Sequence, residues 1–126
     1  MEQKLIYPKL SYKIVGILYD VFNEIGGGHR ENYYQKALAL ALQENKITFK
    51  GQIVIPLKYK ENKIGKYVLD FLIENKIVLE IKKDNIFRKS NIQQIYTYLK
   101  ATGLKLGILA NFTNNGVKFK RILNIK

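Results

Sequence analysis

Two short apolar runs joined by three residues constrain this chain more than any other feature. Residues 67–73 carry a single charge, Asp70, and residues 77–82 carry Glu80 and Lys82. A charged group buried among apolar side chains is costly unless it is paired with an opposite charge or bound to a metal ion. Because these charges lie in neighbouring runs, one explanation should account for all of them.

The connection between the runs favours an antiparallel hairpin with one apolar face. Side chains alternate between the two faces of a strand, and directly opposed residues share a face. A three-residue connection over residues 74–76 gives a wholly apolar face, whereas a two-residue connection mixes charged and apolar residues. Register follows the face that must be buried, so the longer connection is expected. The predicted pairs are Ile73–Ile77, Phe71–Leu79 and Leu69–Ile81 on the apolar face, and Asp70–Glu80 and Val68–Lys82 on the other.

This register brings two carboxylates together. Opposed residues have Cα atoms about 4.5–5.5 Å apart. Asp70 and Glu80 would therefore repel each other, and one pKa would rise unless a cation lies between them. Carboxylate oxygens are hard ligands that suit Mg²⁺ or Mn²⁺, and Lys82 would stand beside the same cation. The alternative for Asp70 is a structural charge paired with Lys82 alone.

The net charge of +12 is concentrated in the second part of the chain. Residues 1–50 hold 7 basic and 5 acidic residues, net +2, whereas residues 51–126 hold 15 basic and 5 acidic residues, net +10. A basic surface around an acidic pair favours a polyanionic partner, most simply nucleic acid. The alternative is a lysine-rich surface that only keeps the protein in solution.

Composition excludes several classes of protein. The 126 residues fit one domain, 1–126, large enough for a hydrophobic core. The chain has no Cys and one His, His29, which excludes disulfides, thiolate metal sites and a His-rich zinc site. No apolar run approaches the ~18–20 residues of a membrane span, and no signal-peptide pattern begins the chain. We therefore expect a soluble, cytoplasmic protein without a membrane partner.

Periodicity predicts the order of helices and strands. Apolar residues at helical spacing indicate helices at 11–25, 30–45 and 91–102. The first helix should begin at an N-cap Ser11 and end at Gly26. The third should begin with a capping box at 90–93 and end at Gly103. Strands are predicted at 47–59, 64–73, 77–83, 105–112 and 117–125, the last at a sheet edge. The order ααβββαββ, with one parallel crossover, predicts an α/β (α+β) fold with a mixed central sheet flanked by helices.

The spacing of the charged residues resembles the active site of the PD-(D/E)xK nuclease superfamily. That site places an Asp on one strand and Glu-x-Lys on the next, here Asp70 and Glu80-Ile81-Lys82, within an α-β-β-β-α-β core. The resemblance implies a restriction-endonuclease-like fold. It also implies that Mg²⁺ or Mn²⁺ is held by Asp70, Glu80 and the Ile81 carbonyl, with Lys82 assisting the attack of water on a phosphodiester.

A closer resemblance is to the small GxxExxR branch of that superfamily. Three segments carry it in order. They are a glycine run followed by Glu31, a Tyr-x-x-Asp strand ending at Asp70, and a Gln-x-x-x-Tyr-Leu helix containing Gln94 and Tyr98. Together these segments extend the resemblance over residues 10–112.

This closer resemblance adds residues to the site. It implies that Glu31 is a further metal or water ligand, and that Gln94 and Tyr98 line the active site and touch the DNA backbone. Each residue also has an ordinary structural explanation. An acid such as Glu31 in a first helical turn favours the helix dipole. Gln94 and Tyr98 share one helix face, where packing alone would explain them.

Together these features predict a metal-dependent phosphodiesterase that acts on DNA, either structure-specific or sequence-nonspecific. Basic side chains in 58–66, 83–89 and 118–121 would hold phosphates without reading sequence. Two alternatives remain open: a nucleic-acid-binding module without turnover, and a nuclease subunit active only with a partner protein. The apolar final strand could also pair edge to edge in a homodimer.

Overall fold

The computed structural model describes residues 6–125, which form the predicted series of elements. Two helices, α1 (Pro8–Ile25) and α2 (Glu31–Glu44), come first. Strands β1 (Phe49–Tyr59), β2 (Asn62–Ile73) and β3 (Ile77–Lys83) follow. Helix α3 (Lys89–Thr102) then leads to β4 (Leu106–Phe112) and β5 (Val117–Leu123). The order ααβββαββ is confirmed. None of the helices in this region is long and apolar enough to cross a membrane.

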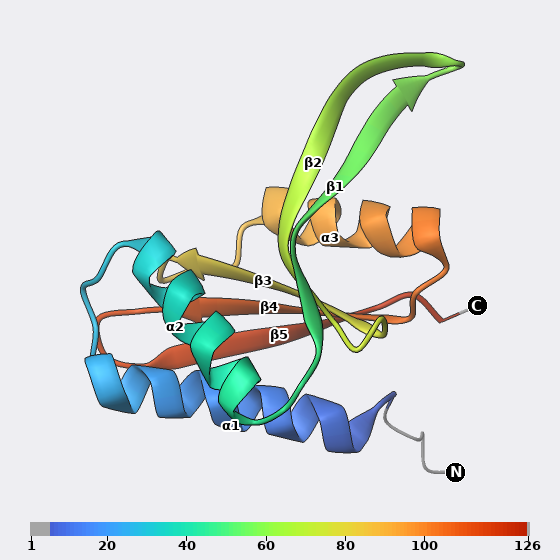
Figure 1. The fold of residues 1–126 in the computed structure, drawn as a ribbon. Coiled ribbons are helices and arrows are strands. Elements are labelled where there is room, and N and C mark those ends of the chain that lie inside the picture. Colours follow the sequence, from blue (N-terminus) through green and yellow to red (C-terminus); the bar gives the residue numbers. More distant parts are fainter. Residues whose placement is uncertain (1–5, 126) are drawn as a thin grey trace, which may run out of the picture.

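The strands of the described region form one mixed sheet in the order β1-β2-β3-β4-β5. Neighbouring strands are antiparallel except β3 and β4, which are parallel because α3 connects them. Helices α1 and α2 cover one face of the sheet, and α3 covers the other (Figure 1). The mixed sheet flanked by helices is therefore confirmed, and β5 lies at an edge as expected.

Each face of the sheet has its own hydrophobic core. Under α1 and α2, Leu18 and Leu38 belong to a cluster that includes Phe71 and Leu79 of the β2–β3 hairpin. The cluster under α3 is smaller and includes Leu69 of β2. Every residue of β4 is buried, as expected for a strand covered on both faces. The site at β2 and β3 is thus supported from both sides of the sheet.

Two predicted helix starts are wrong. Helix α1 begins at Pro8, whose fixed φ suits a first helical position, with Tyr7 as its N-cap. Ser11 lies buried inside the helix, and its Oγ accepts a hydrogen bond from Arg121 Nη1 at 2.6 Å. Helix α3 begins at Lys89, before the predicted capping box, and its N-cap makes no side-chain bond. Neither helix begins with a capping side chain.

Both predicted helix ends are confirmed. Gly26 and Gly103 cap α1 and α3 with φ of 79°. Glycine enters this left-handed region without the steric cost that a side chain would bring. The backbone N–H of each cap donates to a carbonyl of the last helical turn, on Phe22 and Leu99 respectively.

The β2–β3 hairpin has the predicted register but ends early. Its backbone pairs are Ile73–Ile77, Leu72–Val78 and Phe71–Leu79. The predicted pairs Leu69–Ile81, Asp70–Glu80 and Val68–Lys82 are not among them. Leu69 packs under α3 instead of joining the apolar face of Phe71. The ladder stops because β2 leaves β3 here and continues with β1.

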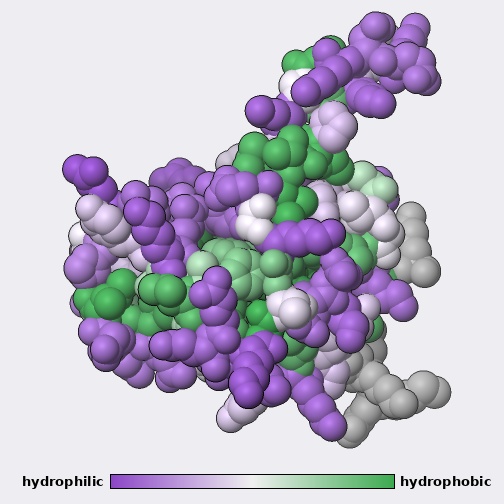
Figure 2. Space-filling view, viewed as in Figure 1, coloured by the Kyte–Doolittle hydropathy of each residue, from purple (hydrophilic) through white to green (hydrophobic). Residues whose placement is uncertain are grey.

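Strands β1 and β2 continue beyond the body of the molecule as a two-stranded arm, defined here as residues 54–68 (Figure 1). The β1–β2 ladder skips Gln52, which adopts a φ of 53° at the register position opposite Asp70. The tip of the arm is covered by hydrophilic side chains, and a hydrophobic band lies where the arm joins the body (Figure 2). Because the ladder skips Gln52, the sheet is distorted opposite Asp70, the residue predicted to carry the chemistry.

Candidate active site

Asp70 and Glu80 meet where β2 and β3 part. The Asp70 backbone N–H donates to Glu80 Oε1 at 2.9 Å, and the Ile81 backbone N–H donates to Asp70 Oδ2 at 2.9 Å. These bonds replace the backbone pairing that the ladder lacks at this point. Both side chains are nearly enclosed, with Asp70 8% and Glu80 3% exposed. The structure therefore brings the two acids and the Ile81 backbone together.

Burial disfavours a second negative charge in this pair. Burial, followed by the charge of nearby Asp70, raises the pKa of the Glu80 carboxyl to about 8. Burial also raises the pKa of Asp70, although the hydrogen bond from Ile81 opposes this shift. Without a cation, the pair consequently keeps one proton at neutral pH. Adjacent acids of raised pKa in one site are typical of catalytic and cation-binding centres.

Lys82 places its ammonium beside this pair. Its Nζ lies 3.4 Å from Glu80 Oε2, and its side chain is partly exposed. The positive charge lowers the pKa of both acids without cancelling the effect of their burial. Within residues 6–125, the ion pair of Lys82 is with Glu80 rather than with Asp70. A structural Asp70–Lys82 pair alone therefore does not describe the site.

Helix α2 supplies a residue that the sequence reasoning missed. Gln35 Nε2 donates to Asp70 Oδ1 at 2.8 Å. With the bond from Ile81, both oxygens of Asp70 are held in place. Gln35 lies four residues after Glu31, so the two share one helix face. That spacing is the signal that could have identified it.

Glu31 lies near the pair but not within it. Its Oε1 accepts a hydrogen bond from the backbone N–H of Lys83 at 3.1 Å. Its charge contributes to the raised pKa of Asp70, which places it within electrostatic reach. No group of three or more acidic or histidine side chains in residues 6–125 is arranged to hold a metal ion. Glu31 is therefore a neighbour of a two-acid centre.

The two predicted residues of α3 have different surroundings. Gln94 Nε2 donates to the carbonyl of Val68 at 3.0 Å, two residues before Asp70, at the root of the arm. Tyr98 is buried in the apolar cluster under α3, and burial raises its pKa. The structure places Gln94 beside the strand that carries the site. The position of Tyr98 favours the packing explanation.

Asn111 is a second residue that the sequence reasoning missed. It is fully buried on β4, directly beside Lys82 in the β3–β4 register. Its Nδ2 donates to the Ile86 carbonyl at 2.7 Å, whereas its Oδ1 has no hydrogen-bond partner in the described structure. A polar residue inside an otherwise apolar strand was the available signal. The free oxygen is an acceptor next to the site for water or an ammonium group.

The carboxylate of Asp70 can be reached from outside. A cavity of about 230 Å³ lies beside it, with Gln35, Gly51 and Gln52 in the wall. Gly51 and Gln52 belong to the distorted part of β1. The absence of a side chain at Gly51 and the irregular backbone of Gln52 leave an approach to Asp70 on the α2 side of the sheet.

The donor set fits a hard divalent cation. Asp70 and Glu80 offer carboxylate oxygens, and Ile81, whose backbone N–H bonds to Asp70 Oδ2, offers a neutral carbonyl oxygen. Mg²⁺ prefers oxygen ligands and is commonly held by one or two carboxylates while it keeps several waters. Two acids are therefore sufficient. Metal ligands must be deprotonated, so a cation bound by the pair would displace the proton that burial keeps on it.

Comparison with known protein families agrees with this geometry. The model of the PD-(D/E)XK nuclease superfamily matches residues 8–122, a span that contains every candidate site residue. None of the curated proteins compared with the chain matches it.

Two solved structures share the fold. The crystal structure of SSO0001 superposes with a TM-score of 0.57 and 19% identity, over 75% of this chain. The chain spans only half the length of that protein, 50%. An alkaline exonuclease from Laribacter hongkongensis, LHK-Exo, superposes with a TM-score of 0.50 and 12% identity, over 91% of this chain and 82% of its own. At such identities the likeness concerns the fold alone.

Proposed function

Because the chain belongs to the PD-(D/E)XK nuclease superfamily, we propose that it is a metal-dependent phosphodiesterase that hydrolyses DNA. One observation carries the proposal. Two buried carboxylates are held side by side by crossed hydrogen bonds at the point where β2 and β3 separate. A purely structural role would not require two acids of raised pKa beside a single partly exposed lysine.

The cation proposed for this centre is Mg²⁺ or Mn²⁺. Members of the superfamily generally use divalent metals. Asp70, Glu80 and the Ile81 carbonyl would hold the ion, and Glu31 would contact its water. When bound, such an ion supplies Lewis-acid polarisation of the scissile phosphate and a more acidic water.

The protein's own residues hold the reacting groups in place. The backbone N–H groups of Asp70 and Ile81 orient the two carboxylates, and Gln35 fixes the remaining Asp70 oxygen. Lys82 holds positive charge where negative charge develops on the phosphate, which preorganises the site for the transition state. Proton loss from Glu80 on loading of the site would restore two negative ligands.

A cleavage panel tests the proposal. Labelled duplex, single-stranded and branched DNA are incubated with MgCl₂ or MnCl₂, and with EDTA in parallel. Wild type should cleave at least one substrate only with the metal, Asp70→Asn should remain at the EDTA background, and Lys82→Ala should lose roughly 100-fold or more in rate. Asp20→Asn, on the exposed side of α1, is the matched control and should cleave like wild type.

The other outcomes separate the alternatives. Cleavage that persists unchanged in Asp70→Asn and Lys82→Ala would show that the site is elsewhere. DNA binding that is unaffected by EDTA and by Glu80→Ala, without cleavage of any substrate, would identify a binding module. Cleavage that appears only after a partner protein is added would identify a nuclease subunit.

A further inference from the structure

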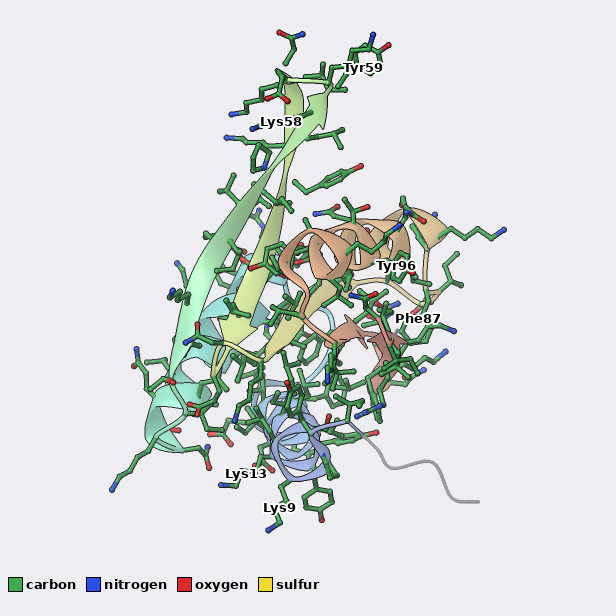
Figure 3. The ribbon with its side chains drawn as sticks, turned by 90° about the vertical axis from the view of Figure 1, so that its right-hand side faces the viewer. Lys9, Lys13, Lys58, Tyr59, Phe87 and Tyr96 are labelled. Carbon is green, nitrogen blue, oxygen red and sulfur yellow. The ribbon has the colours of Figure 1, made fainter. Side chains whose placement is uncertain are left out.

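The arm carries basic charge that the rest of the described structure leaves unneutralised. Residues 54–68 contain a single acid, Glu61, and the four lysines Lys58, Lys60, Lys63 and Lys66, all exposed. The ion pairs within residues 6–125 join Lys82 to Glu80 and Arg88 to Asp84, so none involves the arm. The labelled Lys58 lies at the far end of the molecule from Lys9 and Lys13 (Figure 3).

Two of these lysines face each other. Lys58 of β1 and Lys63 of β2 are register partners near the tip, after the irregularity at Leu57. Like charges directly opposed in an antiparallel pair destabilise it. The exposure of the arm adds to this destabilisation, because an isolated two-stranded ribbon is only marginally stable in water. A polyanion bound along the arm would relieve the repulsion.

Three of the four lysines, Lys58, Lys63 and Lys66, lie on the face of the arm that leads to the active site. Residues alternate in side-chain direction, so Lys66 and Val68 share a face with Asp70, while Leu69 points to the opposite face and packs under α3. Lys58 is two residues after Pro56, the register partner of Lys66, and the ladder skips Ile64, so Lys58 and its partner Lys63 continue the same row. At about 3.3 Å per residue, Lys66 lies ~13 Å along the strand from Asp70, and the Lys58–Lys63 pair lies ~20 Å away.

The aromatic side chains of the arm are on its other face. Tyr67 is paired with Ile55, and Tyr59 with Asn62, at the positions that alternate with the lysines. Proteins that bind single-stranded nucleic acid combine positive charge with aromatic rings on which the bases stack. The lysine face carries Val54, Pro56 and Val68 in place of such rings. It is therefore suited to phosphates whose bases are already paired.

We propose that the arm is a clamp for double-stranded DNA. A two-stranded β-ribbon fits the major groove of a duplex, whose axis carries one phosphate charge per about 1.7 Å. The ribbon lies along a groove, and Lys58, Lys63 and Lys66 bind phosphates ~13–20 Å along the duplex from the one positioned at Asp70. This inference rests on the proposed function, because it assigns a duplex to the same active site.

Binding measured without cleavage tests the clamp separately from the nuclease. Fluorescence anisotropy of a labelled duplex of about 30 base pairs is recorded in EDTA across KCl concentrations of about 50–200 mM. The variants compared are Lys58→Gln/Lys63→Gln/Lys66→Gln and a matched triple on exposed lysines of the body, Lys9→Gln/Lys13→Gln/Lys105→Gln. Thermal melting of each variant checks that the fold is intact.

The expected result is a loss of affinity confined to the arm variant. Losing three phosphate contacts should lower the slope of log Kd against log salt concentration by about 2.7 and weaken binding tenfold or more. The body variant should keep most of the wild-type slope and affinity. Equal slopes for wild type and arm variant would overturn the clamp, as would an arm effect seen only with a single strand of the same sequence.

The two failures are distinguishable. If wild type binds the duplex through the arm but cleaves no DNA with Mg²⁺ or Mn²⁺, the clamp stands and the nuclease proposal fails. If wild type cleaves but the arm variant binds and cleaves the duplex equally well, the nuclease stands and the clamp fails.

Discussion

Glu80 Oε1 accepts a hydrogen bond from the backbone N–H of Asp70 at 2.9 Å, in the gap where β2 leaves β3. The reciprocal bond runs from the Ile81 N–H to Asp70 Oδ2. Each strand therefore holds the carboxylate of the other. The remaining oxygens face Gln35 and Lys82, so the arrangement is fixed before any cation binds.

The stability of the metal-free protein should fall as pH rises. The ordinary pKa of Glu80 is 4.5, whereas in the folded protein burial and the Asp70 charge raise it to about 8. Between these values the folded state binds more protons than the unfolded state, so the free energy of unfolding decreases with increasing pH. Urea denaturation in EDTA at several pH values across this window measures the slope.

The matched variants for this experiment are Glu80→Gln and Glu44→Gln. Replacement of Glu80 should flatten the slope, because the amide does not titrate. Glu44, at the exposed end of α2, should leave the slope unchanged when replaced. A slope in Glu80→Gln as steep as that of wild type would show that other groups cause the pH dependence.

Metal loading should release protons. At pH 7 Glu80 of the metal-free pair is largely protonated, and carboxylates bind cations only after deprotonation. Calorimetric titration with MnCl₂ in buffers of different ionisation enthalpy should detect a released proton near pH 7 and little release above pH 9. The apparent affinity should rise over the same interval. Proton release in Glu80→Gln equal to that of wild type would assign the proton to another group.

Gln35 is predicted to be a positioning residue. Gln35→Ala removes the donor to Asp70 Oδ1, and loss of such supporting contacts typically costs about 10–100-fold in metal affinity or activity. The Mn²⁺ concentration giving half-maximal cleavage should therefore rise, with recovery of the rate at saturating metal. Gln43→Ala, exposed on the same helix, is the control. An unchanged metal requirement in Gln35→Ala would remove Gln35 from the site.

Two glycines should respond to alanine with opposite signs. A Cβ at Gly27 would overlap the backbone of Asn114, which joins the α1–α2 turn to the β4–β5 turn. Gly27→Ala should therefore destabilise the protein by about 1 kcal/mol or more. Gly16 lies inside α1 with open space around it, so Gly16→Ala should stabilise by roughly 0.5–1 kcal/mol. Urea midpoints measure both, and equal shifts would contradict the close approach at Gly27.

Local patterns in the sequence were sufficient for the elements and for the hairpin register. The alternation in residues 67–73 and 77–82 placed Ile73 opposite Ile77, as observed. Alternation could not show where the ladder ends, because β2 separates from β3 beyond Phe71 while it stays paired with β1 along the arm. It predicted strands at 47–59 and 64–73 but not that their adjoining ends form an exposed ribbon.

The missed and mistaken residues depend on contacts between distant parts of the chain. Gln35 reaches Asp70 across 35 positions, and Ser11 bonds to Arg121 across 110 positions. No local pattern reports such a contact. The resemblance to a known family placed Glu31 and Gln94 near the site. It placed Tyr98 there too, although its surroundings are those of a core residue.

The position of Mn²⁺ in crystals grown with the ion is the sharpest test of whether the Asp70–Glu80 pair holds the catalytic cation. The anomalous difference map should show one peak in contact with a carboxylate oxygen of each acid and with the Ile81 carbonyl oxygen, and Asp70→Asn crystals should lack it. A peak elsewhere in wild-type crystals at pH 8 or above, with Lys82 still paired to Glu80 and the two acids unliganded, would contradict the proposed metal centre.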